Sequence, residues 1–238
     1  MIEYVIKAPT VDKSEKNIIP ENLFQPPFRI LVVAPSNSGK SVLISNLISS
    51  HDLPYRKLFR KNIFIWSSTF NLDDPSFSMS DNIEKDNVYD SYSESSIMDL
   101  VNEQTGIIKD IGKKKAPHLL FIFDDVVTDI PKSKASIINR LFFSARHLNV
   151  SIVLISQQYK MINRPIRLNA SDLIVFETGN QSENKILASE QAIDENLFKE
   201  IYKDATKEPY SFLCVRNKLP LKKRYQKRLS SQIYKISD

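Results

Sequence analysis

The stretch FRILVVAPSNSGKSVLISNL, residues 28–47, decides the fold. It begins with FRILVVA, a largely apolar run rich in branched side chains, which is typical of a strand buried on both faces of a parallel sheet. A short polar loop follows from Pro35, and then apolar residues recur near helical spacing. The stretch therefore predicts a strand, a loop and a helix in direct succession.

The loop matches the phosphate-binding pattern G-x-x-x-x-G-K-[ST] at every defined position except the first, where Ala34 replaces glycine. Backbone N–H groups and the positive end of the following helix can surround a phosphate, and Gly39 lets the backbone come close. We expect Lys40 to neutralise the β- and γ-phosphates of a nucleotide and Ser41 to bind Mg²⁺. Ala34 adds only a methyl group, so we expect it to alter the start of the loop without abolishing binding. The predicted nucleotide-binding residues are Ala34, Pro35, Ser36, Asn37, Ser38, Gly39, Lys40 and Ser41. A chance serine-rich turn before a helix is the alternative.

A second apolar run, LLFIFDD at 119–125, ends in two acids. An acid at the carboxyl end of such a strand can hold Mg²⁺ through water beside the phosphate loop, and we assign this role to Asp124. Asp125 stands where ATPases that cleave with water usually have glutamate, so we expect it to polarise the attacking water. It is one methylene shorter, which leaves the turnover rate open. A strand end or a helix cap is the alternative role for the pair.

Another apolar run, VSIVLISQQ at 150–158, places Gln157 and Gln158 just beyond a strand. A neutral amide there can contact both the γ-phosphate and the lytic water, and we assign this sensor role to Gln157. The alternative is a polar pair that simply ends a strand. Small-molecule P-loop kinases generally lack this arrangement, because their catalysis depends on an arginine-rich mobile lid. The order of loop, acid pair and sensor therefore favours ATP hydrolysis.

The remaining elements alternate along the chain. Beyond the three strands above, further strands are expected at 62–68, 88–89, 171–178 and 210–216, with helices at about 95–111, 132–148 and 182–203, and a surface excursion at 71–87. Strands alternating with helices predict a mostly parallel α/β sheet covered on both faces. The fold class expected is a P-loop NTPase of the additional-strand, RecA-like type.

Composition narrows the remaining possibilities. The 238 residues are 42% hydrophobic with a net charge of +5, which excludes a disordered or collagen-like chain. A single cysteine, Cys214, permits no internal disulfide and indicates a reducing compartment, and the three scattered histidines do not form a metal-binding pattern. There is no signal-like start and no apolar run long enough for a membrane helix, so we expect neither secretion nor a membrane span.

The chain is expected to divide into an N-terminal arm at 1–24, an ATPase domain at 25–216 whose ordered core begins at Phe28, and a basic C-terminal tail at 217–238. The tail carries six cations within eleven residues, at 218–228, and such a run can bind DNA phosphates without reading sequence. The alternative for this run is a solvated surface without DNA contact. The same alternative applies more strongly to GKKK at 112–115.

Taken together, APSNSGKS, LLFIFDD, SARHLNVSIVLISQQ and LNASDLIVFETGNQSENKILASEQ resemble the FtsK-HerA superfamily of DNA-pumping ATPases. The resemblance covers about residues 25–195 and is closest to the poxvirus-type genome-packaging ATPases of large DNA viruses and virophages. It implies an ATP-driven translocase that moves double-stranded DNA into a preformed capsid, using Mg-ATP at the subunit interfaces of a ring. It also implies a viral protein of the host cytoplasm or viral factory, or one associated with the virion.

The same resemblance implies partners and a further catalytic residue. The ring has five or six copies of the chain around duplex DNA and docks on capsid or virion vertex proteins. Arg146, which stands before the sensor strand, is expected to be the arginine finger that reaches the neighbour's ATP, with Arg140 as the second choice. A solvated helix residue or an internal ion pair is the alternative for either arginine.

Three other functions stay open at this point. A cellular or plasmid DNA translocase of the same superfamily would share every catalytic residue. A small-molecule P-loop kinase would act as a monomer without stimulation by DNA. A nucleotide-binding structural switch with negligible turnover is the third, because Asp125 replaces glutamate.

Overall fold

The computed structural model describes residues 19–69, 81–131, 133, 136–230 and 232–236. The first eighteen residues of the predicted arm, most of the predicted surface excursion and the first residues of the helix expected at 132–148 lie outside these ranges. The strands are β1 (Arg29–Val33), β2 (Ile63–Trp66), β3 (Val88–Tyr89), β4 (Leu119–Asp124), β5 (Val150–Ser156), β6 (Asp172–Phe176), β7 (Phe212–Arg216) and β8 (Tyr225–Lys227). The α-helices are α1 (Lys40–Ser49), α2 (Tyr55–Phe59), α3 (Glu94–Ile111), α4 (Ile137–Ser144), α5 (Arg164–Asn169), α6 (Gln181–Ser189) and α7 (Glu195–Thr206). The 3₁₀ helices are η2 (Lys85–Asn87), η3 (Ala145–Leu148), η4 (Tyr159–Met161) and η5 (Leu221–Lys223).

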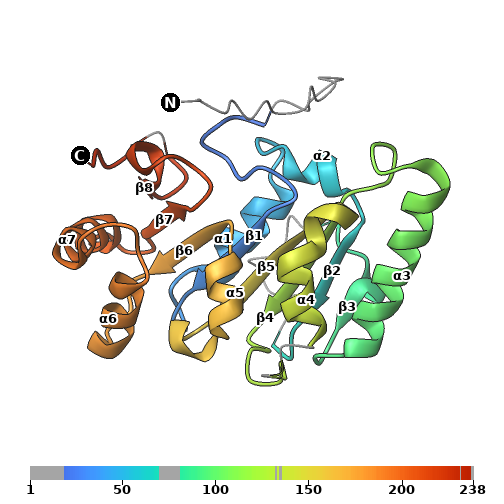
Figure 1. Ribbon diagram of the computed structural model, residues 1–238, viewed down its shortest axis with the longest axis horizontal. Helices are drawn as coiled ribbons and strands as arrows, with labels where there is room; N and C mark the ends of the chain where they lie inside the picture. The colour runs from blue at the N-terminus through green and yellow to red at the C-terminus, as the bar shows by residue number, and fades with distance from the viewer. Residues whose placement is uncertain (1–18, 70–80, 132, 134–135, 231, 237–238) are drawn as a thin grey trace, which may run out of the picture.

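The eight strands of the described residues form one sheet in the order β3-β2-β4-β5-β1-β6-β7-β8 (Figure 1). Every pair from β3 to β6 is parallel, whereas β7 is antiparallel to β6 and β8 is antiparallel to β7. Strand β5 lies between β1 and β4, so the strand of the phosphate loop and the strand of the acid pair are separated by one additional strand. The mostly parallel sheet of the additional-strand type is therefore confirmed.

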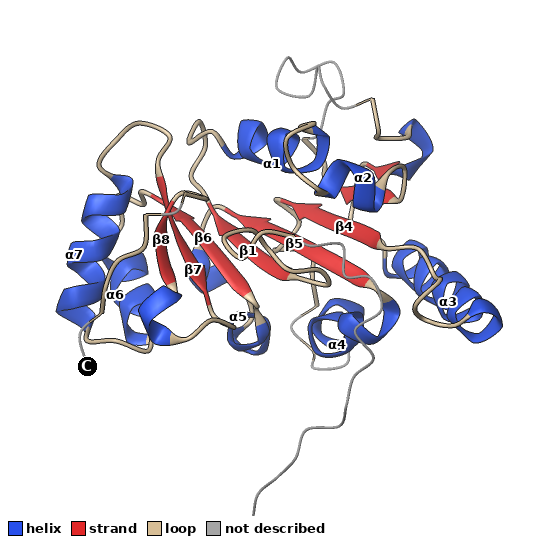
Figure 2. Ribbon diagram, turned by 90° about the horizontal axis from the view of Figure 1, so that it is seen from above, coloured by secondary structure: helices blue, strands red, loops and turns tan. Residues whose placement is uncertain are grey.

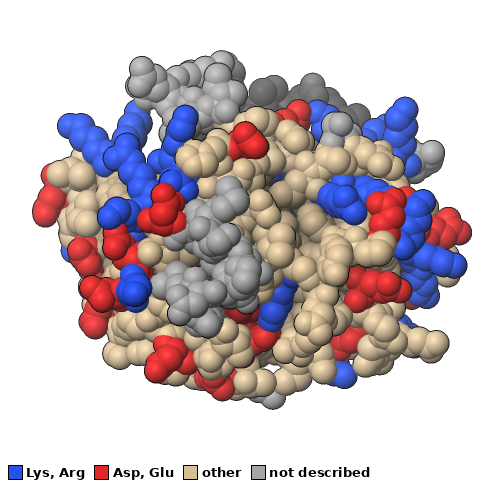
Figure 3. Space-filling model, turned by 180° about the vertical axis from the view of Figure 1, so that it is seen from behind, with Lys and Arg blue, Asp and Glu red and all other residues tan. Residues whose placement is uncertain are grey.

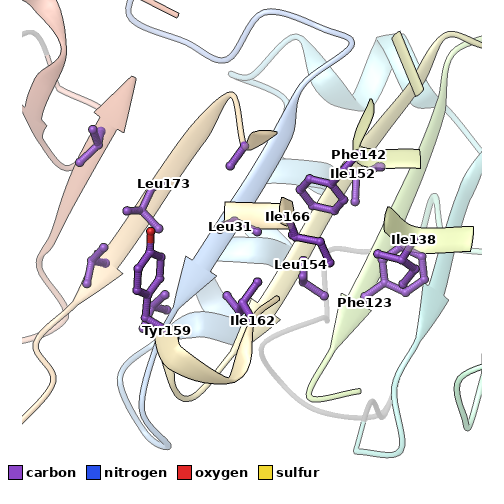
Figure 4. Packing of buried hydrophobic residues seen from close by; sticks show 14 of the residues in the cluster. Leu31, Phe123, Ile138, Phe142, Ile152, Leu154, Tyr159, Ile162, Ile166 and Leu173 are labelled. Atoms are coloured by element: carbon purple, nitrogen blue, oxygen red, sulfur yellow. The ribbon is translucent and has the colours of Figure 1, made fainter. Parts of the chain in front are cut away.

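Helices cover both faces of the sheet (Figure 2). Along β1, Ile30 and Val32 pack with α1 and α2, while Leu31 and Val33 point to the face covered by α4 to α7. Because successive side chains of a strand point to opposite faces, a run that is apolar throughout can fill both layers. Figure 4 shows the second of these layers, where Leu154 and Phe123 from the sheet lie near Phe142 and Ile138 from α4.

The ordered core begins earlier than Phe28. Phe24 is fully buried, and its carbonyl oxygen accepts a hydrogen bond of 2.9 Å from the hydroxyl of Tyr55 in α2. Arg216 of β7 donates to the carbonyl oxygen of Leu23 at 2.8 Å and to Asp172 of β6 at 2.6 Å. The expected start at Phe28 was wrong, because contacts with distant parts of the chain bury a segment that has no periodic pattern of its own.

The C-terminal segment expected as a tail also contributes to the sheet. Tyr225 is fully buried in β8, which pairs with β7 through Val215 and Tyr225 in register. Lys227 lies in the same short strand, and its Nζ pairs with Glu208 at 2.9 Å. The sequence analysis did not predict β8, since a three-residue strand among cations has no visible apolar period.

Two predicted helices have different limits in the structure. The helix expected at 132–148 is α4, which begins after Ser136, whose side chain accepts a hydrogen bond from the Asn139 N–H, and is followed by η3. The helix expected at 182–203 is two helices, because α6 ends at Ser189 and Asp194 caps the start of α7. Short helices α2 and α5 were not predicted. Within the described residues, no helix is long and apolar enough to cross a membrane.

Candidate nucleotide site

The phosphate loop joins β1 to α1 at the carboxyl edge of the sheet. Gly39 has φ +92° and stands immediately before α1, a left-handed conformation that side chains disfavour. Among the described residues, no side chain caps the start of α1, and its first turn contains no acidic residue. The first N–H groups of the helix are therefore available to an anion, and the helix dipole favours negative charge there.

Ala34 occupies the position where the pattern has glycine. Its φ is not positive, its side chain is fully buried in the layer beside α1, and its N–H donates to the Ser156 carbonyl oxygen at 3.0 Å. The backbone at this position therefore does not need glycine, and the methyl group has a place in the core.

The middle of the loop faces solvent. Ser36 and Asn37 are exposed, Pro35 is half-buried, and Asn37 has a left-handed φ of +61°. The hydroxyl oxygen of Ser38 is buried and has no hydrogen-bond partner within the described residues. A buried hydroxyl without a partner costs free energy, so this group fits a ligand that supplies one.

The acid pair lies directly across from the loop. Asp124 is the last residue of β4, and Asp125 follows it with a left-handed φ of +55°. The Lys40 Nζ lies 2.5 Å from Asp125 Oδ2 and 3.4 Å from Asp124 Oδ1. The structure thus brings together Lys40, Asp124 and Asp125, and the lysine charge is balanced by carboxylates of its own chain.

Gln157 joins this group from the end of β5. Its side-chain N–H donates to Asp125 Oδ2 at 3.2 Å, so one carboxylate oxygen accepts from both Gln157 and Lys40. Gln157 and Asp125 also line a pocket of about 240 Å³ with Ser156 and Thr128. The backbone N–H of the neighbouring Gln158 donates a hydrogen bond to the Ser156 hydroxyl. Of the two glutamines, Gln157 is therefore the one beside the acid pair.

Burial and charge change the pKa values of this group. Burial raises the pKa of Asp124, and the nearby charge of Asp125 adds to the rise, while Lys40 opposes it. Burial alone would lower the pKa of Lys40, but its hydrogen bond to Asp125 and the charge of Asp124 outweigh burial, so the pKa is raised. Lys40 therefore stays charged at neutral pH. Within the described part of the chain, Oδ1 of Asp124 is buried and accepts no hydrogen bond, although the Lys40 Nζ lies 3.4 Å away.

Ser67 is a further polar residue of the site that the sequence analysis missed. It follows β2, it is almost fully buried, and its hydroxyl lies 3.5 Å from Asp124 Oδ2. Its signal in the sequence is a serine immediately after the apolar run at 63–66. That signal has meaning only once β2 and β4 are known to be neighbours in the sheet.

Ser41 and the two arginines complete the predicted set. Ser41 is half-buried in the first turn of α1. Arg140 on α4 and Arg146 in η3 are both exposed, and the Arg146 Nε lies 3.3 Å from a ring nitrogen of His147. Arg146 precedes β5, whereas Gln157 follows it, so the arginine lies at the opposite edge of the sheet from the phosphate loop. It therefore does not join the site within one chain.

The basic run at 218–228 is partly neutralised within the chain. Lys223 pairs with Glu21 at 2.9 Å, and Glu208 pairs with Lys227 at 2.9 Å and with Arg228 at 3.4 Å. Figure 3 shows one face of the molecule, where basic side chains gather near two ends, with acidic side chains among them. The described cations thus do not form one continuous stripe on that face.

These features define a protein with the P-loop ATPase fold. It has an additional strand between β1 and β4, a loop that ends in glycine before a helix, and an acid pair opposite the lysine of that loop. Residues 15–225 match the family described as Poxvirus A32 protein. The chain belongs to this poxvirus A32 protein family.

Named relatives and a solved structure resemble the chain at different levels. The DNA packaging protein OPG160 of Variola virus is 31% identical over 179 residues, 74% of this chain, and the protein of the same name from Monkeypox virus is 30% identical over 198 residues, 79% of this chain. The chain spans 62% of the length of each of these relatives. The genome packaging NTPase B204 of Sulfolobus turreted icosahedral virus 2, solved with sulfate, has a TM-score of 0.57 at 19% identity and covers 82% of this chain and 94% of its own. The likeness to B204 concerns the fold.

Proposed function

We propose that this chain is a viral motor subunit that hydrolyses ATP and moves double-stranded DNA into a preformed capsid. The observation that carries the proposal is the convergence of Lys40, Asp125 and Gln157 at the carboxyl edge of the sheet, beside the uncapped start of α1. The family supports the second half of the proposal, because its named poxvirus relatives are DNA packaging proteins.

The residues of the site have distinct roles in hydrolysis. The loop N–H groups and Lys40 hold the β- and γ-phosphates, and the phosphates replace Asp125 as the partner of Lys40. Asp125, released from the lysine, orients a water molecule and accepts its proton as the water oxygen bonds to the γ-phosphorus. The bond from that phosphorus to the β–γ bridging oxygen breaks, and ADP and phosphate leave. Gln157 donates its amide N–H to the γ-phosphate oxygens.

Ser41 and Asp124 are the residues that would hold Mg²⁺. The fit rests on Asp124, whose buried Oδ1 accepts no hydrogen bond within the described residues and, once Lys40 turns to the phosphates, can accept one from a metal-bound water. The described residues include no group of three or more His, Cys, Asp or Glu side chains suited to a metal. This agrees with Mg²⁺ in nucleotide sites, which protein groups hold by only one or two contacts, together with phosphates and water. When bound, Mg²⁺ neutralises charge that develops on the phosphate oxygens.

Several copies of the chain would form a ring of five or six subunits around duplex DNA. Arg146 is exposed and lies away from the site of its own chain, which suits a guanidinium that reaches the ATP of a neighbour, and Arg140 is the second candidate. The basic run at 218–228 would contact DNA phosphates regardless of base sequence. Such a ring would act in the host cytoplasm or viral factory, dock on capsid or virion vertex proteins, or stay with the virion.

The test is steady-state ATP hydrolysis with and without long duplex DNA, measured together with the mass of the protein in solution with nucleotide. We expect hydrolysis that rises with DNA in a ring-sized assembly, and its loss in Lys40→Ala. Lys109→Ala is the matched control, since Lys109 is exposed on α3, remote from the loop. Full hydrolysis by Lys40→Ala would overturn the catalytic assignment. A monomer that needs a small-molecule acceptor and ignores DNA would favour a kinase, and negligible turnover with tight nucleotide binding would favour a switch.

A further inference from the structure

A pocket of about 470 Å³ opens beside the phosphate loop. Residues 35–38 of the loop form one wall, and residues 206–211, which connect α7 to β7, form the other. Phe176 and Glu177, at the end of β6, lie between the two walls. This volume is within the range of small-molecule sites in proteins.

The order of the strands indicates which part of a nucleotide this pocket would hold. Strands β5 and β4, which bring Gln157 and Asp125, lie on one side of β1, and β6 and β7 lie on the other. Resting on the proposed function, the γ-phosphate lies beside Gln157 and Asp125, where the water attacks. The phosphate chain then crosses the loop, and the nucleoside lies on the side of β6 and β7, in this pocket.

The pocket contains an exposed aromatic side chain. Tyr210 is 70% exposed, whereas Tyr55, Tyr159 and Tyr225 are almost fully buried. An exposed ring of this size gains little from the fold itself, because the free energy of burial grows with the apolar area removed from water. A ligand that covers the ring would provide that burial.

The backbone holds Tyr210 in an unusual conformation. Its φ is +59°, which is rare for a bulky residue and directs attention to function. The turn is held on its C-terminal side by Ser211, whose N–H donates to the Glu208 carbonyl oxygen at 3.0 Å and whose hydroxyl accepts from Arg228 at 3.1 Å. The turn therefore holds the backbone of Tyr210 in place.

The ring also lies against the phosphate loop. A Cβ atom at Gly39 would come within 3.1 Å of the Tyr210 Cδ1 carbon. Gly39 thus provides both the left-handed turn before α1 and the space for this ring. Tyr210 borders the loop on one side and the pocket on the other.

We propose that Tyr210 stacks on the base of the bound nucleotide and makes the site select nucleoside triphosphates over a bare triphosphate. The ring is neutral and can offer its face to a planar base. Stacking of a base on an aromatic ring is sequence-tolerant because every base has a π-face, so the contact adds affinity without choosing among the bases.

The experiment measures equilibrium binding of ATP and of inorganic tripolyphosphate, each with Mg²⁺, by isothermal titration calorimetry. The main variant is Tyr210→Asn, because asparagine adopts the left-handed conformation more readily than other non-glycine residues and so keeps the turn. We expect it to weaken ATP binding about tenfold and to leave tripolyphosphate binding unchanged. Tyr210→Phe should keep both affinities. Leu168→Ala is the matched control, since Leu168 is 59% exposed on α5, outside the pocket.

Three results with the variants would overturn the inference. Unchanged ATP binding by Tyr210→Asn would exclude stacking, and an equal loss for both ligands would mean that Tyr210 acts on the phosphates through the loop and not on the base. Tighter binding of both ligands would mean that the ring covers the phosphate site. Each of these leaves the proposed function standing, provided the wild-type protein binds ATP through Lys40. A wild-type protein that binds neither ligand would overturn the proposed function as well.

Discussion

Lys40 and Asp125 are 85 residues apart in the chain, and their side chains form an ion pair of 2.5 Å. Asp125 Oδ2 also accepts a hydrogen bond from Gln157, so the loop lysine, the acid pair and the residue after β5 are already joined. In the proposed mechanism, the bound nucleotide takes Lys40 away from Asp125, and the same exchange frees the carboxylate to act on water. The proposal therefore couples nucleotide binding to activation of the base through one lysine.

The first prediction concerns the pKa of Asp124. Burial and Asp125 raise this pKa, and Lys40 holds the rise in check. Lys40→Met should therefore raise the pKa of Asp124 further, measured by ¹³C NMR titration of the carboxyl carbons. The raised pKa means that Asp124 is protonated at a higher pH than an ordinary aspartate. As the pH falls, Mg²⁺-dependent hydrolysis by the wild type should therefore decline at a higher pH than it would with an aspartate of ordinary pKa. Lys109→Met should leave the titration unaltered, and an unshifted Asp124 in Lys40→Met would contradict the assigned contact.

The second prediction separates binding from hydrolysis at Asp125. Asp125→Asn keeps the left-handed backbone, which asparagine tolerates, but removes the carboxylate. Turnover should fall at least about 100-fold, the usual contribution of a general base, while ATP binding persists. Single-turnover hydrolysis and calorimetric titration measure the two effects. Asp125→Glu, which restores a carboxylate, should recover part of the rate, and a normal rate in Asp125→Asn would remove the residue from the mechanism.

The third prediction concerns the first position of the phosphate loop. Ala34→Gly should leave ATP affinity unchanged, because the backbone there has no positive φ. It should lower the free energy of unfolding by about 1 kcal/mol, since a buried methyl group is lost and the unfolded chain gains freedom. Urea denaturation and ATP titration check both parts. A large change in ATP affinity would show that the methyl group shapes the loop.

The fourth prediction concerns Arg146. Since it lies at the opposite edge of the sheet from its own phosphate loop, Arg146→Ala should leave ATP binding intact and reduce turnover of the assembled protein about 1,000-fold. Mixing the variant with wild-type subunits tests action between neighbours, because activity should then fall out of proportion to the fraction of variant. Arg140→Ala is the comparison. If it alone abolished turnover, the finger would be Arg140.

The fifth prediction concerns the ion pair of Asp172 and Arg216, which are paired in register on β6 and β7 and almost fully buried. Asp172→Ala should lower the free energy of unfolding by about 3–5 kcal/mol, because the arginine charge is then buried without its partner. Chemical denaturation measures this free energy of unfolding. Lys199→Ala, which breaks an exposed pair with Glu195, should change it by less than about 1 kcal/mol. Similar losses in the two variants would argue against a special role for burial.

Local pattern was enough for much of the fold. Seven of the strands follow apolar runs that the sequence displays, and α1 and α3 have helical spacing close to their observed limits. The break between α6 and α7 was missed although Asp194 is a standard helix cap, because the apolar spacing continues across it. Strand β8 and the burial of Phe24 could not be predicted, since both depend on partners far away in the sequence.

The sequence by itself determined the phosphate loop, the acid pair and Gln157, because each follows a strand that its own apolar residues reveal. Only the tertiary structure decided that Lys40 forms an ion pair with Asp125, that Ser67 lies beside Asp124, and that Tyr210 lies against Gly39. The reason is physical. Strand and helix formation depend on side chains a few residues apart, whereas these contacts depend on the order of strands in the sheet, which the packing of both core layers sets at once.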